Sequence, residues 1–435
     1  MKPSLVGVVC FLGLLGAAAC NSSNSPPAGQ GGGTGGAGGA AGTNAGGTAG
    51  SNADGAAGMS DAAEAGMNDS SVSGVLITRP NPIISRTAQV FSSPAGAAGT
   101  INDGTYHNGG WRIPVASLPG WVAFKLTAGP TRILLSWDDG GTYNYQDPAT
   151  ATVYGLPAGY RIELSADSTN GSDGIWMPGV IVGDVSTNLN QVRTRAHALD
   201  FTGMTWVKMT ITAAPANESS NGVQLGEIDI HDISATSSGL PEDTWFFMGD
   251  SITAFAYDRA PVHQPSFARA INTASPTFYP AMINGGIGGE LSRDGLARLA
   301  RVLELNPDFR FFALGYGTND AANGQVPTAT FRTNMQSMID MLKAAGRTPI
   351  IAHIPFSGDG SHGMIPAYNT VIDELVQTNQ LPIGPDLYTH FQQNPGEFTC
   401  PPCGGGRTTD NLHPNDTGLA AMNSLWATAA RPLYP

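Results

Sequence analysis

A serine that directly follows an apolar stretch is the clearest candidate for chemistry in this sequence. Residues 245–248 read as a buried β-strand, and the strand ends at the turn Gly249-Asp250-Ser251. Open α/β sheets bind their ligands beyond the carboxyl ends of the strands, which is where Ser251 would lie. A serine hydroxyl is a weak nucleophile at neutral pH, so it needs a general base and donors that stabilise an oxyanion. The alternative role for Ser251 is to cap a helix.

Three further polar turns could supply those groups. The glycine-rich turn 284–289 and the turn 315–320 each follow a predicted strand, and the turn 410–415 precedes the last predicted helix. The carboxyl ends of parallel strands lie along one edge of a sheet. We therefore expect these turns to meet around Ser251 although they are far apart in the sequence.

The side chains of these turns suit a hydrolytic reaction. Ser251 would attack a carbonyl, and His413 would take its proton and return it to the leaving group. Asp410, three residues before His413, could orient the imidazole. The candidate oxyanion donors are the Ser251 N–H, an N–H of the turn 284–289 and the amide of Asn319. Glycine is required in that turn because a side chain would block the close approach of the backbone.

The elements that must position these turns alternate along the second half of the chain. The predicted strands cover residues 245–248, 278–283, 309–314, 349–354 and 382–387. The predicted helices cover residues 267–274, 294–305, 330–345, 368–377 and 418–429. In the second of these helices the spacing places a buried face on Leu296, Leu299, Ala300 and Leu303. The alternation predicts a parallel sheet with helices on both faces.

The four motifs, in this order and over residues 243–435, resemble those of the SGNH hydrolases, a branch of the GDSL esterase and lipase group. The resemblance implies a three-layer, flavodoxin-like α/β hydrolase domain that uses no metal or cofactor. It assigns catalysis to Ser251, Asp410 and His413. It assigns the oxyanion hole to Ser251, Gly289 and Asn319, with Gly288 as an alternative to Gly289.

The nucleophile motif also bears on the substrate. Ile252 stands where lipase-like members of the group have leucine, and Gly-Asp-Ser-Ile-Thr is more similar to the members that deacetylate polysaccharides. Tyr257 and His263 follow the serine closely and could contact a substrate. The resemblance thus implies an esterase that acts on acylated carbohydrates.

The first half of the folded chain has a different pattern. Over residues 75–235, short apolar runs with period-two alternation are separated by turn clusters, which predicts an antiparallel β-sandwich. The segments 102–104, 160–165 and 226–230 resemble the discoidin-type, galactose-binding-like jelly roll. The resemblance implies an accessory, carbohydrate-binding module and a candidate structural calcium site near the turn 102–104. Packing support for the hydrolase domain is the alternative role.

The N-terminus reads as an export signal and a tether. Residues 1–20 carry a basic start, a short apolar core and Gly16-Ala17-Ala18-Ala19-Cys20, which resembles a bacterial lipoprotein signal with lipidation at Cys20. Ordinary secretion is the alternative. Residues 21–74 are rich in Gly, Ala and Ser and predict a disordered linker. We expect a protein of the bacterial cell envelope, anchored in the membrane by lipid alone, or a secreted one.

Composition excludes some partners. Against 34 acidic residues stand 21 lysines and arginines, giving a net charge of −13, which argues against nucleic acid as a ligand. Cys400 and Cys403 form one C-x-x-C pair without a second pair to complete a zinc site, so an exported protein favours a local disulfide. We expect a monomer whose partner is an acylated polysaccharide or oligosaccharide.

Three functions fit these features. The first is a serine esterase that removes acyl groups, acetyl above all, from carbohydrate esters. The second is a GDSL-type lipase or thioesterase for longer acyl chains, which would need a wide apolar cleft. The third is a surface carbohydrate-binding protein with an inert hydrolase half, and the complete set of Ser251, Asn319 and His413 argues against it.

Overall fold

The computed structural model describes residues 83–104, 110–127, 129–139, 157–182, 195–214, 222–234, 243–257, 266–398 and 411–434. All of them belong to one compact unit, Val72–Pro435. The predicted signal segment and the whole of the predicted linker lie outside the described residues. So do Cys20, Cys400, Cys403 and Asp410, and the predictions made for these residues stay predictions.

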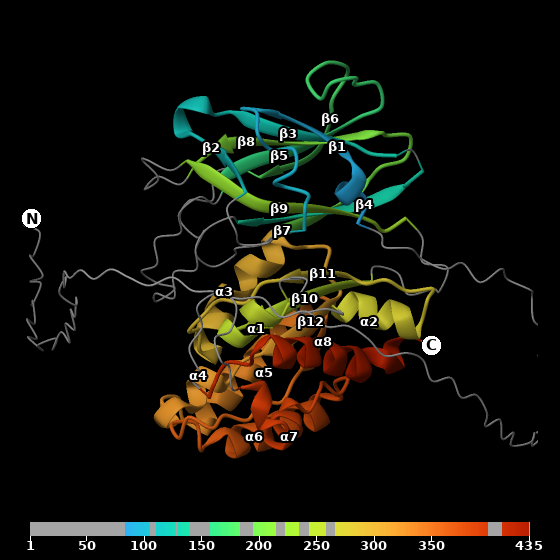
Figure 1. The fold of residues 1–435 in the computed structure, drawn as a ribbon. Helices are drawn as coiled ribbons and strands as arrows, with labels where there is room; N and C mark the ends of the chain where they lie inside the picture. Colours follow the sequence, from blue (N-terminus) through green and yellow to red (C-terminus); the bar gives the residue numbers. More distant parts are fainter. Residues whose placement is uncertain are drawn as a thin grey trace, which may run out of the picture. The chain divides into compact units, whose positions relative to one another are not determined.

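The first part of this unit contains two antiparallel sheets, which confirms the predicted strand arrangement (Figure 1). One sheet has the order β1 (Gln89–Ser93), β3 (Gly120–Lys125), β8 (Trp206–Ala213), β5 (Gly159–Ser165) and β6 (Met177–Val182). The other has the order β2 (Trp111–Ile113), β9 (Val223–Asp232), β4 (Arg132–Asp139) and β7 (Arg195–Asp200). Of two short 3-10 helices, η1 (Ile84–Thr87) precedes β1 and η2 (Val115–Ser117) lies between β2 and β3.

The two sheets share one hydrophobic core because alternate residues of each strand point inward. In β8, Val207, Met209 and Ile211 are fully buried, and β4 contributes Ile133 and Leu135 from the facing sheet. The alternation of apolar residues in the sequence thus matches the alternation of buried residues along these strands. Kinship with the galactose-binding-like family stays a prediction.

The second part is an α/β structure around a parallel sheet of order β11-β10-β12-β13. The strands are β10 (Thr244–Gly249), β11 (Ala281–Asn284), β12 (Phe311–Gly315) and β13 (Thr348–Ile351). The helices are α1 (Ser251–Ala256), α2 (Phe267–Ala274), α3 (Ser292–Leu305), α4 (Thr318–Ala321), α5 (Thr328–Ala344), α6 (Ile365–Asn379), α7 (Leu387–Gln393) and α8 (Asp416–Ala430). Short 3-10 turns are η5 (Ala322–Gly324), η6 (Pro395–Glu397) and η7 (Arg431–Leu433). Among the helices of the described residues, none combines the length and the hydropathy that a membrane span needs.

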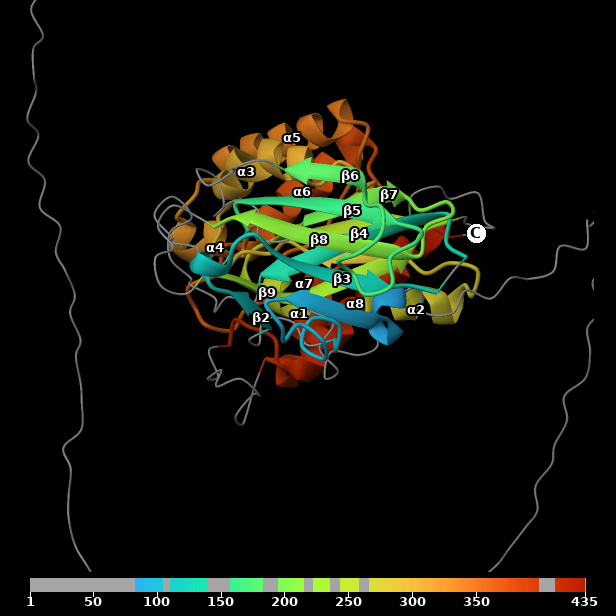
Figure 2. The same cartoon turned by 90° about the horizontal axis from the view of Figure 1, so that it is seen from above.

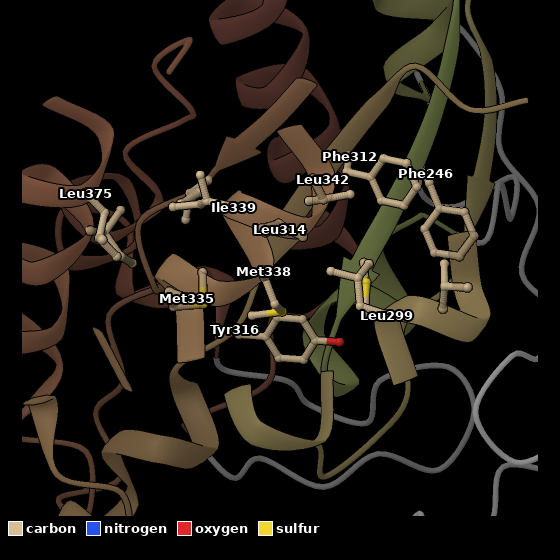
Figure 3. Close-up of a cluster of buried hydrophobic side chains, with 14 of the residues drawn as sticks. Phe246, Leu299, Phe312, Leu314, Tyr316, Met335, Met338, Ile339, Leu342 and Leu375 are labelled. Atoms are coloured by element: carbon tan, nitrogen blue, oxygen red, sulfur yellow. The ribbon is translucent and has the colours of Figure 1, made fainter. Parts of the chain in front are cut away.

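Alternation along β10 divides the apolar residues between two cores. Phe246 and Met248 pack on the face covered by α3, α5 and α6, and Trp245 and Phe247 pack on the face covered by α2 and α8. Figure 3 shows the first core, and in Figure 2 the helices α3 and α5 lie side by side over it. The prediction of helices on both faces of a parallel sheet is confirmed. The apolar positions of α5 run through this core at helical spacing, as Met335, Met338, Ile339 and Leu342.

Apart from the exact ends of the elements, two sequence predictions are wrong in this part. Residues 382–387 do not form a strand: only Ile383 makes a bridge, to Ile351, and Asp386 caps α7, so that Leu387 already begins that helix. The buried face of α3 is also rotated from the predicted one. Ala300 is exposed, and Arg298 lies inside instead. The sequence pattern gives no reason to place the charged side chain of Arg298 in the core.

The open edge of β7 is capped by side chains that follow α3. Asn306 Oδ1 accepts a hydrogen bond from Ala196 N–H at 2.9 Å, and Asp308 Oδ2 accepts one from Ala198 N–H at 2.9 Å. Edge strands expose unpaired backbone groups that invite aggregation. These two side chains satisfy alternate N–H groups of β7.

Candidate active site

The predicted nucleophile lies where β10 passes into α1. Asp250 caps this helix by accepting a hydrogen bond from Ile252 N–H at 3.0 Å, and Ser251 is the first helical residue. The capping role considered for Ser251 is therefore wrong, because Asp250 holds it. Glycine is needed at position 249 because a Cβ there would lie 2.4 Å from the Gly315 carbonyl oxygen of β12.

The histidine of the last motif lies against this serine. The Oγ of Ser251 and the Nε2 of His413 are 2.8 Å apart, although 162 positions separate the residues. The Phe255 ring meets the imidazole edge-on, with 5.7 Å between ring centroids. The loop is held by Asn415, which caps α8 through a hydrogen bond from Gly418 N–H at 3.1 Å. At 2.8 Å a neutral imidazole can accept the serine proton.

The glycine-rich turn after β11 is tied to the helix of the nucleophile. Asn284 Nδ2 donates to the Ala254 carbonyl oxygen at 2.7 Å, and Asn284 Oδ1 accepts from Gly286 N–H at 3.0 Å. A Cβ on Gly286 would lie 2.4 Å from Ala254 N, so the turn and the helix are in direct contact. Gly289 is exposed and has a φ of 77°, a conformation that favours glycine. Gly288, the alternative donor, is buried.

The predicted oxyanion asparagine lies next to this turn. Asn319 belongs to α4, whose N-cap Gly317 has a φ of 124°. Its side-chain Nδ2 donates to the Glu290 carbonyl oxygen at 2.9 Å. An amide nitrogen carries two hydrogens, so this bond fixes one and leaves the other for a ligand. Since Glu290 follows Gly289 directly, the two predicted donors are neighbours in space.

The aspartate after Asn319 braces the same region. Asp320 is buried and accepts hydrogen bonds from Ser292 N–H at 2.9 Å and from the Ser292 hydroxyl at 2.5 Å. These bonds join α4 to the start of α3. Burial raises the pKa of Asp320, while the bonds from Ser292 oppose the rise. Burial also raises the pKa of Asp250 to about 7.

Comparison with known proteins supports the predicted hydrolase family. Residues 247–421 match the model of the GDSL-like Lipase/Acylhydrolase family, a range that contains all four turns. This part of the chain is a GDSL/SGNH hydrolase domain. The protein is accordingly an enzyme of the carboxylic ester hydrolase type.

A curated relative is similar to the hydrolase domain. The Escherichia coli K12 protein named thioesterase 1/protease 1/lysophospholipase L1 is 25% identical over 191 residues, which are 44% of this chain and 85% of the relative. Among solved structures, a lipase/acylhydrolase from Enterococcus faecalis is 26% identical, covering 44% of this chain and 97% of its own, with a TM-score of 0.38. An acetylxylan esterase from Geobacillus stearothermophilus is 18% identical, covering 45% and 94%, with a TM-score of 0.35.

The structure places the other predicted site residues as follows. Tyr257 is buried and stacks on Phe247 with 4.1 Å between ring centroids, and its contact with a substrate stays a prediction. Asp410 and His263 lie outside the described residues, and the role of Asp410 in orienting His413 stays a prediction. Across the described ranges, no group of three or more histidine, cysteine or acidic side chains is placed to hold a metal ion.

One feature of the hydrolase domain escaped the sequence analysis. Behind the glycine-rich turn lies a buried ion pair, Glu290 with Arg298, joined by Tyr316. The position of Arg298 in the helix is the signal that could have indicated its burial. Arg298 is three residues from Gly295 and four from Val302, on the stripe of α3 that the structure buries.

Proposed function

We propose that the protein is a serine esterase that removes acyl groups, acetyl above all, from carbohydrate esters. The observation that carries the proposal is the 2.8 Å separation of Ser251 Oγ and His413 Nε2 at the carboxyl edge of the sheet. A serine and an imidazole in hydrogen-bond contact are the minimum for nucleophilic attack with general-base assistance.

The reaction has two halves. In the first, Ser251 Oγ attacks the ester carbonyl carbon while His413 Nε2 takes the hydroxyl proton. The C–O bond to the sugar then breaks, His413 gives the proton to the departing oxygen, and an acyl-serine remains. In the second half, His413 takes a proton from water, which attacks the acyl carbon, and the proton returns to Ser251 as the carboxylic acid leaves. Asp410 would keep the imidazole in the productive tautomer.

Negative charge develops on the carbonyl oxygen in both halves. The backbone N–H groups of Ser251 and Gly289 and the free hydrogen of the Asn319 amide would bind this oxygen. The first two belong to a helix start and to an exposed glycine, and the third is anchored on the Glu290 carbonyl oxygen. Fixed donors of this kind supply the largest single share of catalysis in many hydrolases.

A short acyl group is supported by the distribution of apolar surface. Within the described ranges, the large hydrophobic side chains that are exposed are Val115, Ile175, Met177, Met364 and Ile383. None of them belongs to the four turns of the site. A long acyl chain would need contiguous apolar surface beside the serine, because about 0.8 kcal/mol is gained per buried methylene. The Gly-Asp-Ser-Ile-Thr motif favours a carbohydrate ester independently.

Two measurements test the proposal. Ser251→Ala should lower kcat on p-nitrophenyl acetate by at least about 10³-fold, whereas Ser424→Ala, at an exposed serine of α8, should leave it unchanged. Full activity of Ser251→Ala would exclude the mechanism. Wild-type kcat/KM should be higher for the acetate than for the octanoate ester, and acetate should be released from acetylated polysaccharides. A preference for octanoate would instead support the lipase or thioesterase alternative.

A further inference from the structure

A buried hydrogen-bond network lies directly behind the proposed oxyanion hole. Glu290 Oε2 accepts from Arg298 Nε at 3.0 Å, from Arg298 Nη2 at 2.8 Å and from the Tyr316 hydroxyl at 2.8 Å. Arg298 Nη2 also contacts the Tyr316 oxygen at 2.9 Å. All three side chains are at most 2% exposed. The three residues come from three places: the turn after β11, the helix α3 and the segment after β12.

Stability alone does not account for this network. Burying an ion pair removes both charges from water, and apolar side chains of the same volume often stabilise a fold as well or better. Burial alone would lower the pKa of Arg298, but Glu290 and Tyr316 reverse the effect and hold it above its usual value. Burial raises the pKa of Glu290, although the bonds from Arg298 and Tyr316 oppose the rise, so a charge is costly at this site. Such an arrangement calls for a geometric reason.

That reason is visible in what the network connects. The Glu290 carbonyl oxygen accepts a hydrogen bond from the side-chain amide of Asn319 at 2.9 Å. Glu290 is also the residue directly after Gly289, so it is bonded to the second proposed donor. Arg298 Nη2 donates to the Gly285 carbonyl oxygen at 2.8 Å and to the Glu290 carboxylate, so the arginine bonds to the glycine-rich turn near its start and just after its end. Tyr316 lies three residues before Asn319 in the sequence, in the segment that follows β12.

We infer that Glu290, Arg298 and Tyr316 are positioning residues that set the separation of the two oxyanion donors, the Gly289 N–H and the Asn319 amide. The inference rests on the proposed function, because it concerns the same reaction. A hole of this kind acts only when its donors are aimed at the oxygen in the transition state. Misplacement by about 1 Å costs about 100-fold in rate. Loosening the network should therefore lower kcat and leave KM nearly unchanged.

The test compares Glu290→Gln and Tyr316→Phe with a matched control on α3. Glu304→Gln removes an exposed partner of Arg301 on the same helix and should change kcat less than twofold. Glu290→Gln should lower kcat on p-nitrophenyl acetate by ~10- to 100-fold with KM within threefold. Tyr316→Phe removes one hydroxyl only, so it should fold like wild type and lose about 3- to 10-fold.

A second readout separates positioning from mere folding. A small alkylboronic acid forms a tetrahedral adduct with a reactive serine and puts an oxygen in the hole. Its inhibition constant should rise in each network variant by about the factor lost in kcat/KM. Variants that lower the melting temperature but keep both kcat and the boronate affinity would overturn the inference. If Ser251→Ala is inactive while these variants behave like wild type, only the inference fails. If Ser251→Ala is active, the proposed function fails.

Discussion

The buried cap of the nucleophile helix makes a prediction whose sign is set by the structure. Asp250 is 1% exposed, and burial raises its pKa from its usual 3.8 to about 7, against the bonds from Ile252 N–H and Thr318. Between these two pH values the folded protein keeps a proton that the unfolded chain has lost. This group therefore contributes stability at low pH, and the contribution is lost as the pH rises from about 4 to about 7.

The magnitude follows from the same values. The rise in pKa corresponds to about 4 kcal/mol between the two protonation states, of which about 2.5 kcal/mol is lost between pH 5 and pH 8. Asp250→Asn keeps a side-chain oxygen for Ile252 N–H and cannot ionise. The variant should gain about 2.5 kcal/mol relative to wild type when the pH is raised from 5 to 8.

The assay is urea unfolding of wild type and Asp250→Asn at pH 5 and pH 8, followed by tryptophan fluorescence and by loss of esterase activity. Activity assigns the transition to the hydrolase domain. Asp173→Asn is the control. Thr169 hydrogen bonds lower the pKa of this exposed carboxyl, so its effect should be the same at both pH values. If Asp250→Asn becomes more destabilising at pH 8, the carboxylate is the favoured form and the reasoning is wrong.

Two further substitutions test particular contacts. Gly295→Ala would place a Cβ 2.4 Å from the Tyr316 ring, so it should destabilise by about 1–3 kcal/mol in thermal unfolding despite the better helix propensity of alanine, and it should lower kcat. Asn306→Ala should leave Ala196 N–H of β7 without its acceptor and cost about 1–3 kcal/mol, measured in urea. Its kcat should stay unchanged, and a lowered kcat would contradict a purely structural role.

The strands and helices of the hydrolase domain were largely predictable because their apolar periodicity reports burial directly. Apolar periodicity mispredicts the strand where residues are buried but do not pair with a neighbouring strand. Phe278 and Tyr279 were predicted as strand because they are apolar, and both are buried, yet β11 begins only at Ala281. Pro280 has no N–H to give to a neighbouring strand. The apolar pattern therefore predicted the core correctly and the hydrogen-bonded ladder only in part.

The convergence of the turns was predictable from topology, but their contacts were not. Parallel strands bring Ser251 and Asn319 to one edge of the sheet, whereas the 2.8 Å approach of His413 depends on how α8 and its cap dock. Arg298 was missed for a similar reason. Sequence patterns treat arginine as a surface residue, and only the fold brings Glu290 and Tyr316 to it. Partners far apart in sequence cannot be read from one helix.

Buried acidic groups recur around the site, and they share one duty. Asp250 accepts a hydrogen bond from Ile252 N–H, and Asp320 accepts one from Ser292 N–H. Glu290 accepts one from Arg298, which in turn donates to the glycine-rich turn. Burial raises the pKa of each carboxyl, so keeping these groups ionised inside the fold costs stability. Apolar replacements would relieve that cost but would release the turns that aim the donors. A more stable and less active enzyme is the expected result, because the cost of burying these carboxyl groups and the catalysis reside in the same few turns.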